Sequence, residues 1–197
     1  MTSKKPSPSI APETLAFKDP AQLLSHDHAE LDELLQALVA SFDKRDSAES
    51  FARLDRFWAR LAMHIRAEHL HLFPSILDAL DDASDLSGDA QGRVRDAIKI
   101  LRHDHDFFMK ELARAVKLMR VATKTSEVPT EVRQIVMAVT TRLGQHNKIE
   151  EETIYNLASR ILTTSQQPIL LTDIYRELHN PPSRFAELND RPIESPN

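Results

Sequence analysis

The 197-residue chain contains no cysteine, only 3 glycines, and only short hydrophobic runs. Without cysteine it can form no disulfide, no thiolate zinc site, no cysteine-ligated iron–sulfur cluster and no cysteine nucleophile. The hydrophobic runs fall short of the roughly 18 apolar residues that a membrane span requires. Any metal that this chain binds must therefore be held by nitrogen and oxygen ligands.

Positive charge is also scarce. The chain has 25 Lys and Arg against 30 Asp and Glu, for a net charge of -5, and no basic run beyond Lys4-Lys5. This balance argues against a nucleic-acid or anionic-membrane partner. The N-terminal residues lack the apolar segment of a secretory signal. We therefore expect a soluble, cytoplasmic protein.

Proline is nearly absent from the middle of the chain, where only Pro74 and Pro129 of the 11 prolines lie between residues 21 and 167. Because an interior proline removes a helical hydrogen bond and clashes with the preceding turn, this distribution predicts a long helical middle with irregular ends. We expect three parts, which are a partly disordered N-terminal arm (1–19), a helical domain (20–163) and a C-terminal tail (164–197). A short helix of the tail, about 171–178, is expected to lie across one end.

In the middle, apolar residues recur every three or four positions, which is the period of a helix. Asp19 and Asp46 are predicted N-caps of the first two helices, and Pro74 is expected to kink or locally break the second. The third helix is expected to follow a turn at 87–92, and the fourth to begin near 129–130. Four amphipathic helices with short connections predict an all-α, antiparallel up-down-up-down four-helix bundle.

Four histidines and two glutamates interrupt the apolar stripes of these helices. They are His28, His64, Glu68, His105, His146 and Glu150. Each buried polar group without a partner costs roughly 1–3 kcal/mol, so these side chains must satisfy one another or hold a metal. A single such histidine is more often a core histidine bonded to a carboxylate. Six such polar residues on four helices favour a metal centre, because inward-facing nitrogen and carboxylate groups are how bundles build one.

Spacing and repetition support this interpretation. Glu68 and Glu150 each follow a histidine by four residues, which puts both side chains on one helix face about 6 Å apart. The chain also repeats itself, pairing HDHAELDELL (26–35) with HDHDFFMKEL (103–112) and HIRAEHLHLF (64–73) with HNKIEEETIY (146–155). Two such halves about a pseudo-two-fold axis supply two histidines to each of two metal ions, and both carboxylates are available to bridge.

These four segments resemble the hemerythrin-like HHE cation-binding domain family over about residues 20–163. The resemblance implies a four-helix bundle around a non-haem di-iron centre, with an oxo or hydroxo bridge, that binds oxygen and related small molecules. It also implies that the six interrupting residues are the iron ligands and that the two glutamates bridge. Zinc and manganese remain alternatives, because they also accept imidazole and carboxylate ligands.

The sequence departs from the oxygen-carrying hemerythrins at two points. Those proteins have a further histidine one turn along the third helix, where this chain has Leu101 and Met109 on either side of His105. They also end with an aspartate five residues after the last histidine, where Glu150 at four residues competes here with Glu151 at five. Glu150 is preferred because four residues return to the same helix face. One nitrogen fewer leaves an open coordination position, so sensing, iron handling and peroxide chemistry compete with oxygen carriage.

The remaining polar residues near the stripes are weaker candidates. His69 lies at a stripe edge and is kept as a lesser candidate ligand, together with its repeat counterpart Glu151. His26 and His103 are expected to point away from the core. Tyr155 is interpreted as a packing residue, with a hydrogen bond near the site as the alternative. The many surface Arg, Asp and Glu residues are interpreted as solvated helix faces.

The favoured hypothesis is a protein that binds or senses oxygen, nitric oxide or iron, with dioxygen or another small diatomic or peroxide molecule as its partner. The second is a di-iron enzyme with peroxidase, catalase-like or oxidase activity. Histidine-rich ligation favours binding, because the motif of ferritin-like oxidases runs Glu-x-x-His rather than His-x-x-x-Glu. A degenerate site in an interaction module is disfavoured, because both halves contain the whole ligand set.

Overall fold

The protein is described by a computed structural model for residues 16–44, 46–84, 86–122 and 127–183. The regular structure of these residues is all helical, and they contain no strand. The helices are α1 (Pro20–Ser41), α2 (Ser47–Ala67), α3 (Phe73–Asp82), α4 (Gly88–Ala122), α5 (Thr130–Ile149), α6 (Asn156–Ile161) and α7 (Gln166–Leu178). Most of the expected N-terminal arm, and residues 184–197 of the tail, lie outside the described residues.

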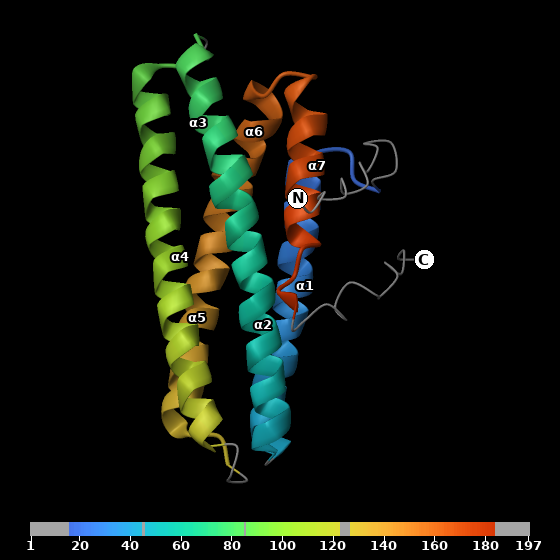
Figure 1. Ribbon diagram of the computed structural model, residues 1–197. Coiled ribbons are helices and arrows are strands. Elements are labelled where there is room, and N and C mark those ends of the chain that lie inside the picture. The colour runs from blue at the N-terminus through green and yellow to red at the C-terminus, as the bar shows by residue number, and fades with distance from the viewer. Residues whose placement is uncertain (1–15, 45, 85, 123–126, 184–197) are drawn as a thin grey trace, which may run out of the picture.

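The long helices form the expected antiparallel bundle. The α2 and α3 helices follow one another as one rod, as do α5 and α6, and these two rods lie beside α1 and α4 (Figure 1). Neighbours in the chain pack together, since α1 contacts α2, α2 contacts α4, and α4 contacts α5. The all-α four-helix bundle is thus confirmed. Within the described residues, no helix is both long and apolar enough to cross a membrane.

Two aspartates cap the first two helices as predicted. The Asp19 carboxylate accepts a hydrogen bond of 2.8 Å from the Gln22 N–H, and Pro20 takes the first helical position. The Asp46 carboxylate accepts one of 2.9 Å from the Glu49 N–H. Each cap satisfies a backbone donor that the first turn of a helix leaves unpaired, so both helix starts are encoded locally.

The turn expected at 87–92 is wrong, because α4 already begins at Gly88. The Ser87 hydroxyl accepts a hydrogen bond of 3.3 Å from the Ala90 N–H, and Ser87 therefore caps the helix from the position directly before Gly88. Gly88 and Gly92 have open space around them inside the helix. A helical glycine costs about 1 kcal/mol relative to alanine, which the packing of a helix of this length overcomes.

Pro74 does not break its helix. Instead the chain passes through a π-helical turn, η3 (Glu68–Leu72), directly before α3. The second rod has a matching π-helical turn, η4 (Glu150–Tyr155), with no proline near it. Proline is therefore not the shared cause. Both turns begin at a glutamate that interrupts an apolar stripe, and π-helical turns are frequent at functional sites.

The core is divided into two hydrophobic clusters. Along α1, Leu24 belongs to one cluster and Leu31 to the other, and along α4 the same holds for Leu101 and Phe108. The buried histidines and glutamates lie between the two clusters on α1, on α4, and on the two rods. The bundle therefore encloses a polar layer with an apolar core on each side of it.

The C-terminal helix differs from expectation in length and position. It spans 13 residues and runs lengthwise beside α1 and α2 instead of across the end of the bundle (Figure 1). Its apolar stripe is buried in the hydrophobic cluster that contains Leu24. The stripe consists of Leu170, Leu171, Ile174 and Leu178. Such a stripe is buried better along two helices than across their ends. The boundary at residue 163 between bundle and tail stays a prediction.

Candidate metal centre

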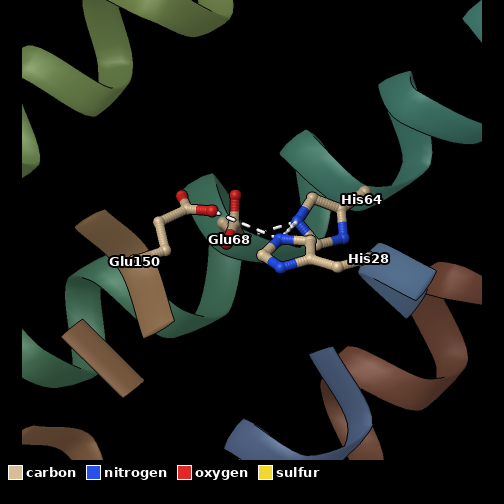
Figure 2. Close-up of side chains that lie close together, drawn as sticks. All are labelled: His28, His64, Glu68 and Glu150. Atoms are coloured by element: carbon tan, nitrogen blue, oxygen red, sulfur yellow. Dashed lines mark hydrogen bonds and ion pairs between the residues drawn. The ribbon is translucent and has the colours of Figure 1, made fainter. Parts of the chain in front are cut away.

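The structure brings the six stripe-interrupting residues together in the polar layer. They form two groups of possible metal ligands, within each of which the ligand atoms lie within 4.8 Å of one another. The first position consists of His28, His64, Glu68 and Glu150, which Figure 2 shows converging from α1 and from the two rods of the bundle. The second position consists of His105, His146 and the same two glutamates. All six residues are buried.

The histidines of each position face one another through the same ring nitrogen. The Nε2 atoms of His28 and His64 lie 3.1 Å apart, and those of His105 and His146 lie 3.0 Å apart. Each position thus gathers two imidazole nitrogens from neighbouring helices. Imidazole nitrogen is a common ligand for iron, zinc and other transition metals.

Each glutamate presents one carboxylate oxygen to each position. Glu68 places Oε1 3.4 Å from His64 Nε2 and Oε2 3.3 Å from His105 Nε2. Glu150 places Oε2 3.3 Å from His28 Nε2 and Oε1 3.1 Å from His146 Nε2. This is the arrangement that two carboxylates need to bridge a pair of metal ions.

Three of these four carboxylate oxygens have no hydrogen bond among the described residues. They are Glu68 Oε2 and both oxygens of Glu150. Burying a charged oxygen without a partner is costly, and native proteins rarely leave one so. A pair of cations between the histidines would satisfy all three, so the donor set fits a two-metal centre.

The pKa shifts show how strongly the metal-free groups depend on one another. Burial alone would raise the pKa of Glu68, but the charge of His64, together with the contacts that His105 and His64 make with the carboxylate, lowers it well below its usual value. Burial would lower the pKa of His64, but Glu68 and Asp27 raise it well above its usual value. The pKa of His146 is also raised, because Glu150 outweighs the effect of burial. A metal must displace protons from these imidazoles.

Two aspartates support the second histidine of each pair. The His64 Nδ1–H donates to Asp27 at 2.8 Å, and the His146 Nδ1–H donates to Asp104 at 3.3 Å. Both aspartates are buried, although the helix period had not singled them out. Such a bond fixes the tautomer, so that the Nε2 lone pair faces the metal position.

An arginine anchors each aspartate in turn. Arg60 binds Asp27, and Arg142 binds Asp104 at 2.7 Å. Burial would raise the pKa of Asp27, but the hydrogen bond from His64 and the charge of Arg60 lower it. The sequence signal was available, since each arginine lies four residues before its histidine and each aspartate is the middle residue of a repeated HDH. None of these four residues was predicted to support the site.

The hemerythrin HHE cation-binding domain family matches residues 19–158. The chain belongs to this family. Neither a search of curated proteins nor a search of solved structures found a match. Membership and geometry agree, because a cation-binding family matches the part of the chain that carries both His/Glu groups.

In this HHE domain, His69 and Glu151 lie outside both groups of possible ligands. Glu151 accepts a hydrogen bond of 3.0 Å from His28 Nδ1, and His69 Nε2 lies 2.8 Å from His105 Nδ1. Both therefore contact the ring nitrogen that points away from the metal position. Each also belongs to the other half of the repeat from the histidine that it contacts. Glu150, by contrast, belongs to both groups.

Two other histidines of the HHE domain lie where the helix period predicts. The His26 and His103 side chains are exposed, and His26 lies 3.6 Å from Glu30. They therefore provide natural controls for the buried histidines.

Tyr155 has a polar role that was assigned to packing. Its hydroxyl donates to Glu68 Oε1 at 2.9 Å and lies 3.2 Å from His28 Nε2. Burial, together with the charges of Glu68 and Glu150, raises the pKa of this phenol well above its usual value. In the metal-free HHE domain Tyr155 is thus a neutral hydrogen-bond donor.

A surface cavity of about 380 Å³ reaches the first position. It lies between α1 and the α5–η4 rod, and its lining includes Asp32, Asn147, Glu151 and the ring of His28. Of the four residues of the first position only His28 lines the cavity, together with Glu151, which bonds to its Nδ1.

Proposed function

We propose that this HHE domain holds two iron ions in its two positions and binds or senses dioxygen or a related diatomic molecule such as nitric oxide. The six buried residues are the proposed ligands, with Glu68 and Glu150 bridging. The observation that carries the proposal is that each of these glutamates presents one oxygen to each histidine pair. Ferrous iron, when bound there, supplies the electrons on which reversible binding of a diatomic molecule depends.

The protein's own contribution is orientation and burial. Asp27 and Asp104 hold the Nδ1–H of two imidazoles, so that their Nε2 atoms stay available to a metal. The hydrophobic clusters on both sides exclude water, which tunes the potential of a bound metal. The cavity beside His28 has room for a small molecule. These features support a small-molecule centre rather than a site for a large substrate.

The test is reconstitution of the full chain with ferrous iron under nitrogen, followed by oxygen. We expect two irons per chain and a change in near-ultraviolet and visible absorption that reverses when oxygen is removed. His26→Ala is the matched control, because this exposed histidine should leave both results unchanged. Two irons without a reversible change would refute oxygen binding, and fewer than two would refute the two-metal centre.

A di-iron enzyme that acts on peroxide is the second candidate. The observation that favours it is the Tyr155 hydroxyl, which donates to Glu68 and which, in an enzyme where it keeps its proton, can supply that proton within the site. We expect such an enzyme to turn over hydrogen peroxide well above the rate of free iron, and His64→Ala to abolish the excess. Turnover at the level of free iron would dismiss this candidate.

A further inference from the structure

The two halves of the repeat place an aromatic ring at the same point beside each metal position. Phe73 stacks on His105 with ring centroids 6.0 Å apart and planes 14° apart. Tyr155 stacks on His28 with centroids 5.6 Å apart and planes 28° apart. Both rings are buried, with 0% and 2% of their surfaces exposed. The packing role is therefore the same, and the hydroxyl is the difference between them.

That hydroxyl lies among the ligand atoms of the first position. It is 2.9 Å from Glu68 Oε1 and 3.2 Å from His28 Nε2, and these two atoms themselves face the metal position. A buried hydroxyl must be paired, whereas a phenylalanine would fill the same space without that requirement, as Phe73 does. Packing alone therefore does not explain the tyrosine.

We propose that Tyr155 is a further metal ligand, through its phenolate oxygen, at the first position only. This inference rests on the proposed function, since it requires a metal at that position. The phenol loses its proton to the solvent as the metal binds, as ligating groups generally do, and no electron is transferred in this step. The first position then has one more anionic oxygen than the second, which has Phe73 in its place. The two ions are consequently held by different donor sets.

The chain itself makes the experiment clean, because it has only 2 tyrosines, Tyr155 and Tyr175. Tyr175 lies on α7, where it stacks on His179. A phenolate bound to ferric iron gives a visible charge-transfer band, and Raman excitation into that band enhances phenolate ring vibrations. Imidazole and carboxylate ligands give neither signal.

The full chain is loaded with iron and oxidised to the ferric state, and metal content, visible absorption and resonance Raman spectra are measured. We expect two irons per chain in the wild type, Tyr155→Phe and Tyr175→Phe. The phenolate ring vibrations and their band should be present in the wild type and Tyr175→Phe and lost entirely in Tyr155→Phe. Far-ultraviolet circular dichroism checks that each variant is folded.

The contradicting outcomes are separable. Two irons in the wild type without phenolate vibrations would overturn the inference and leave the proposed function standing, whether or not Tyr155→Phe folds. Vibrations that persist in Tyr155→Phe would overturn it as well. No metal in the wild type would overturn the proposed function, and the inference with it.

Discussion

The two halves of the molecule, α1–α2–η3 and α4–α5–η4, carry the same chemistry but do not complete their own sites. Each half supplies two histidines to one position and divides the oxygens of its glutamate between both. Each π-helical turn supports the other half, since Glu151 bonds to His28 and His69 bonds to His105. Neither helix pair alone can therefore form a complete position.

The halves differ in polarity around the histidines. Glu151 and Tyr155 surround His28 with oxygen, whereas His69 and Phe73 surround His105 with an imidazole and a hydrocarbon ring. The aspartate support is also closer in the first position, at 2.8 Å against 3.3 Å. The two metal positions thus have the same ligand types but different surroundings. Matching substitutions in the two halves should therefore differ in their effect on metal binding.

The largest effect should come from the shared carboxylates. Glu68→Ala and Glu150→Ala each remove an oxygen from both positions, so we expect most of the bound metal to be lost. His64→Ala removes a ligand from the first position alone and should leave about half of the metal, as His146→Ala should for the second. Elemental analysis of the purified variants measures this. Equal losses in the glutamate and histidine variants would contradict a shared bridge.

The second prediction concerns pH and tests whether the histidines respond to metal as ligands. The raised pKa values of His64 and His146 stabilise the metal-free fold below the usual histidine pKa of about 6.5, and this stabilisation is lost as pH rises through the folded values. Metal requires neutral imidazoles, so its binding strengthens over the same range. The difference in melting temperature between loaded and metal-free protein should therefore widen as pH rises above about 6.5. A constant or narrowing difference would show that these histidines do not bind the metal.

The third prediction compares the two aspartates. Asp27→Asn should weaken metal binding at the first position roughly 10–100-fold, the usual range for a residue that orients a ligating histidine. Asp104→Asn should have a smaller effect, because its bond to His146 is longer. Competition with a chelator measures both affinities, and the exposed Asp96→Asn is the control. A larger loss of affinity in Asp104→Asn than in Asp27→Asn would contradict the inference that the aspartate support is stronger at the first position.

The smallest effect on metal affinity should come from Glu151 and His69, each of which contacts a histidine of the other half. Glu151→Gln should lower affinity at the first position only a few-fold, because this side chain is 47% exposed and its interaction is screened by solvent. His69→Gln should have a comparable effect at the second position. The same chelator competition measures both. If Glu151→Gln removed the metal while Glu150→Gln retained it, Glu151 would be the ligand.

The helix period alone was enough to predict the bundle and the six residues of the two groups. Residues four apart share a helix face wherever the helix lies, so the pairing of Glu68 with His64 required no knowledge of the neighbours. Asp27 and Asp104 lie one residue from the stripe. Whether that flank is buried depends on the adjacent helix, which the sequence pattern does not specify.

The π-helical turns and the position of α7 were missed for related reasons. A π-helical turn changes the hydrogen-bond partner by one residue without changing the composition, and nothing near Glu150 distinguishes η4 from an α-helix. The α7 stripe indicated an amphipathic helix but not the groove that receives it. The hydrogen bond of Tyr155 was open to prediction, because this residue occupies the repeat position of Phe73 and differs from it by a hydroxyl.

The most direct test of the two-metal centre is a crystal structure of the iron-loaded chain with diffraction data collected on both sides of the iron absorption edge. We predict two anomalous peaks inside the bundle, one beside His28 and His64 and one beside His105 and His146, with both glutamates contacting both peaks. A single peak, or peaks outside the layer between the two hydrophobic clusters, would contradict the account.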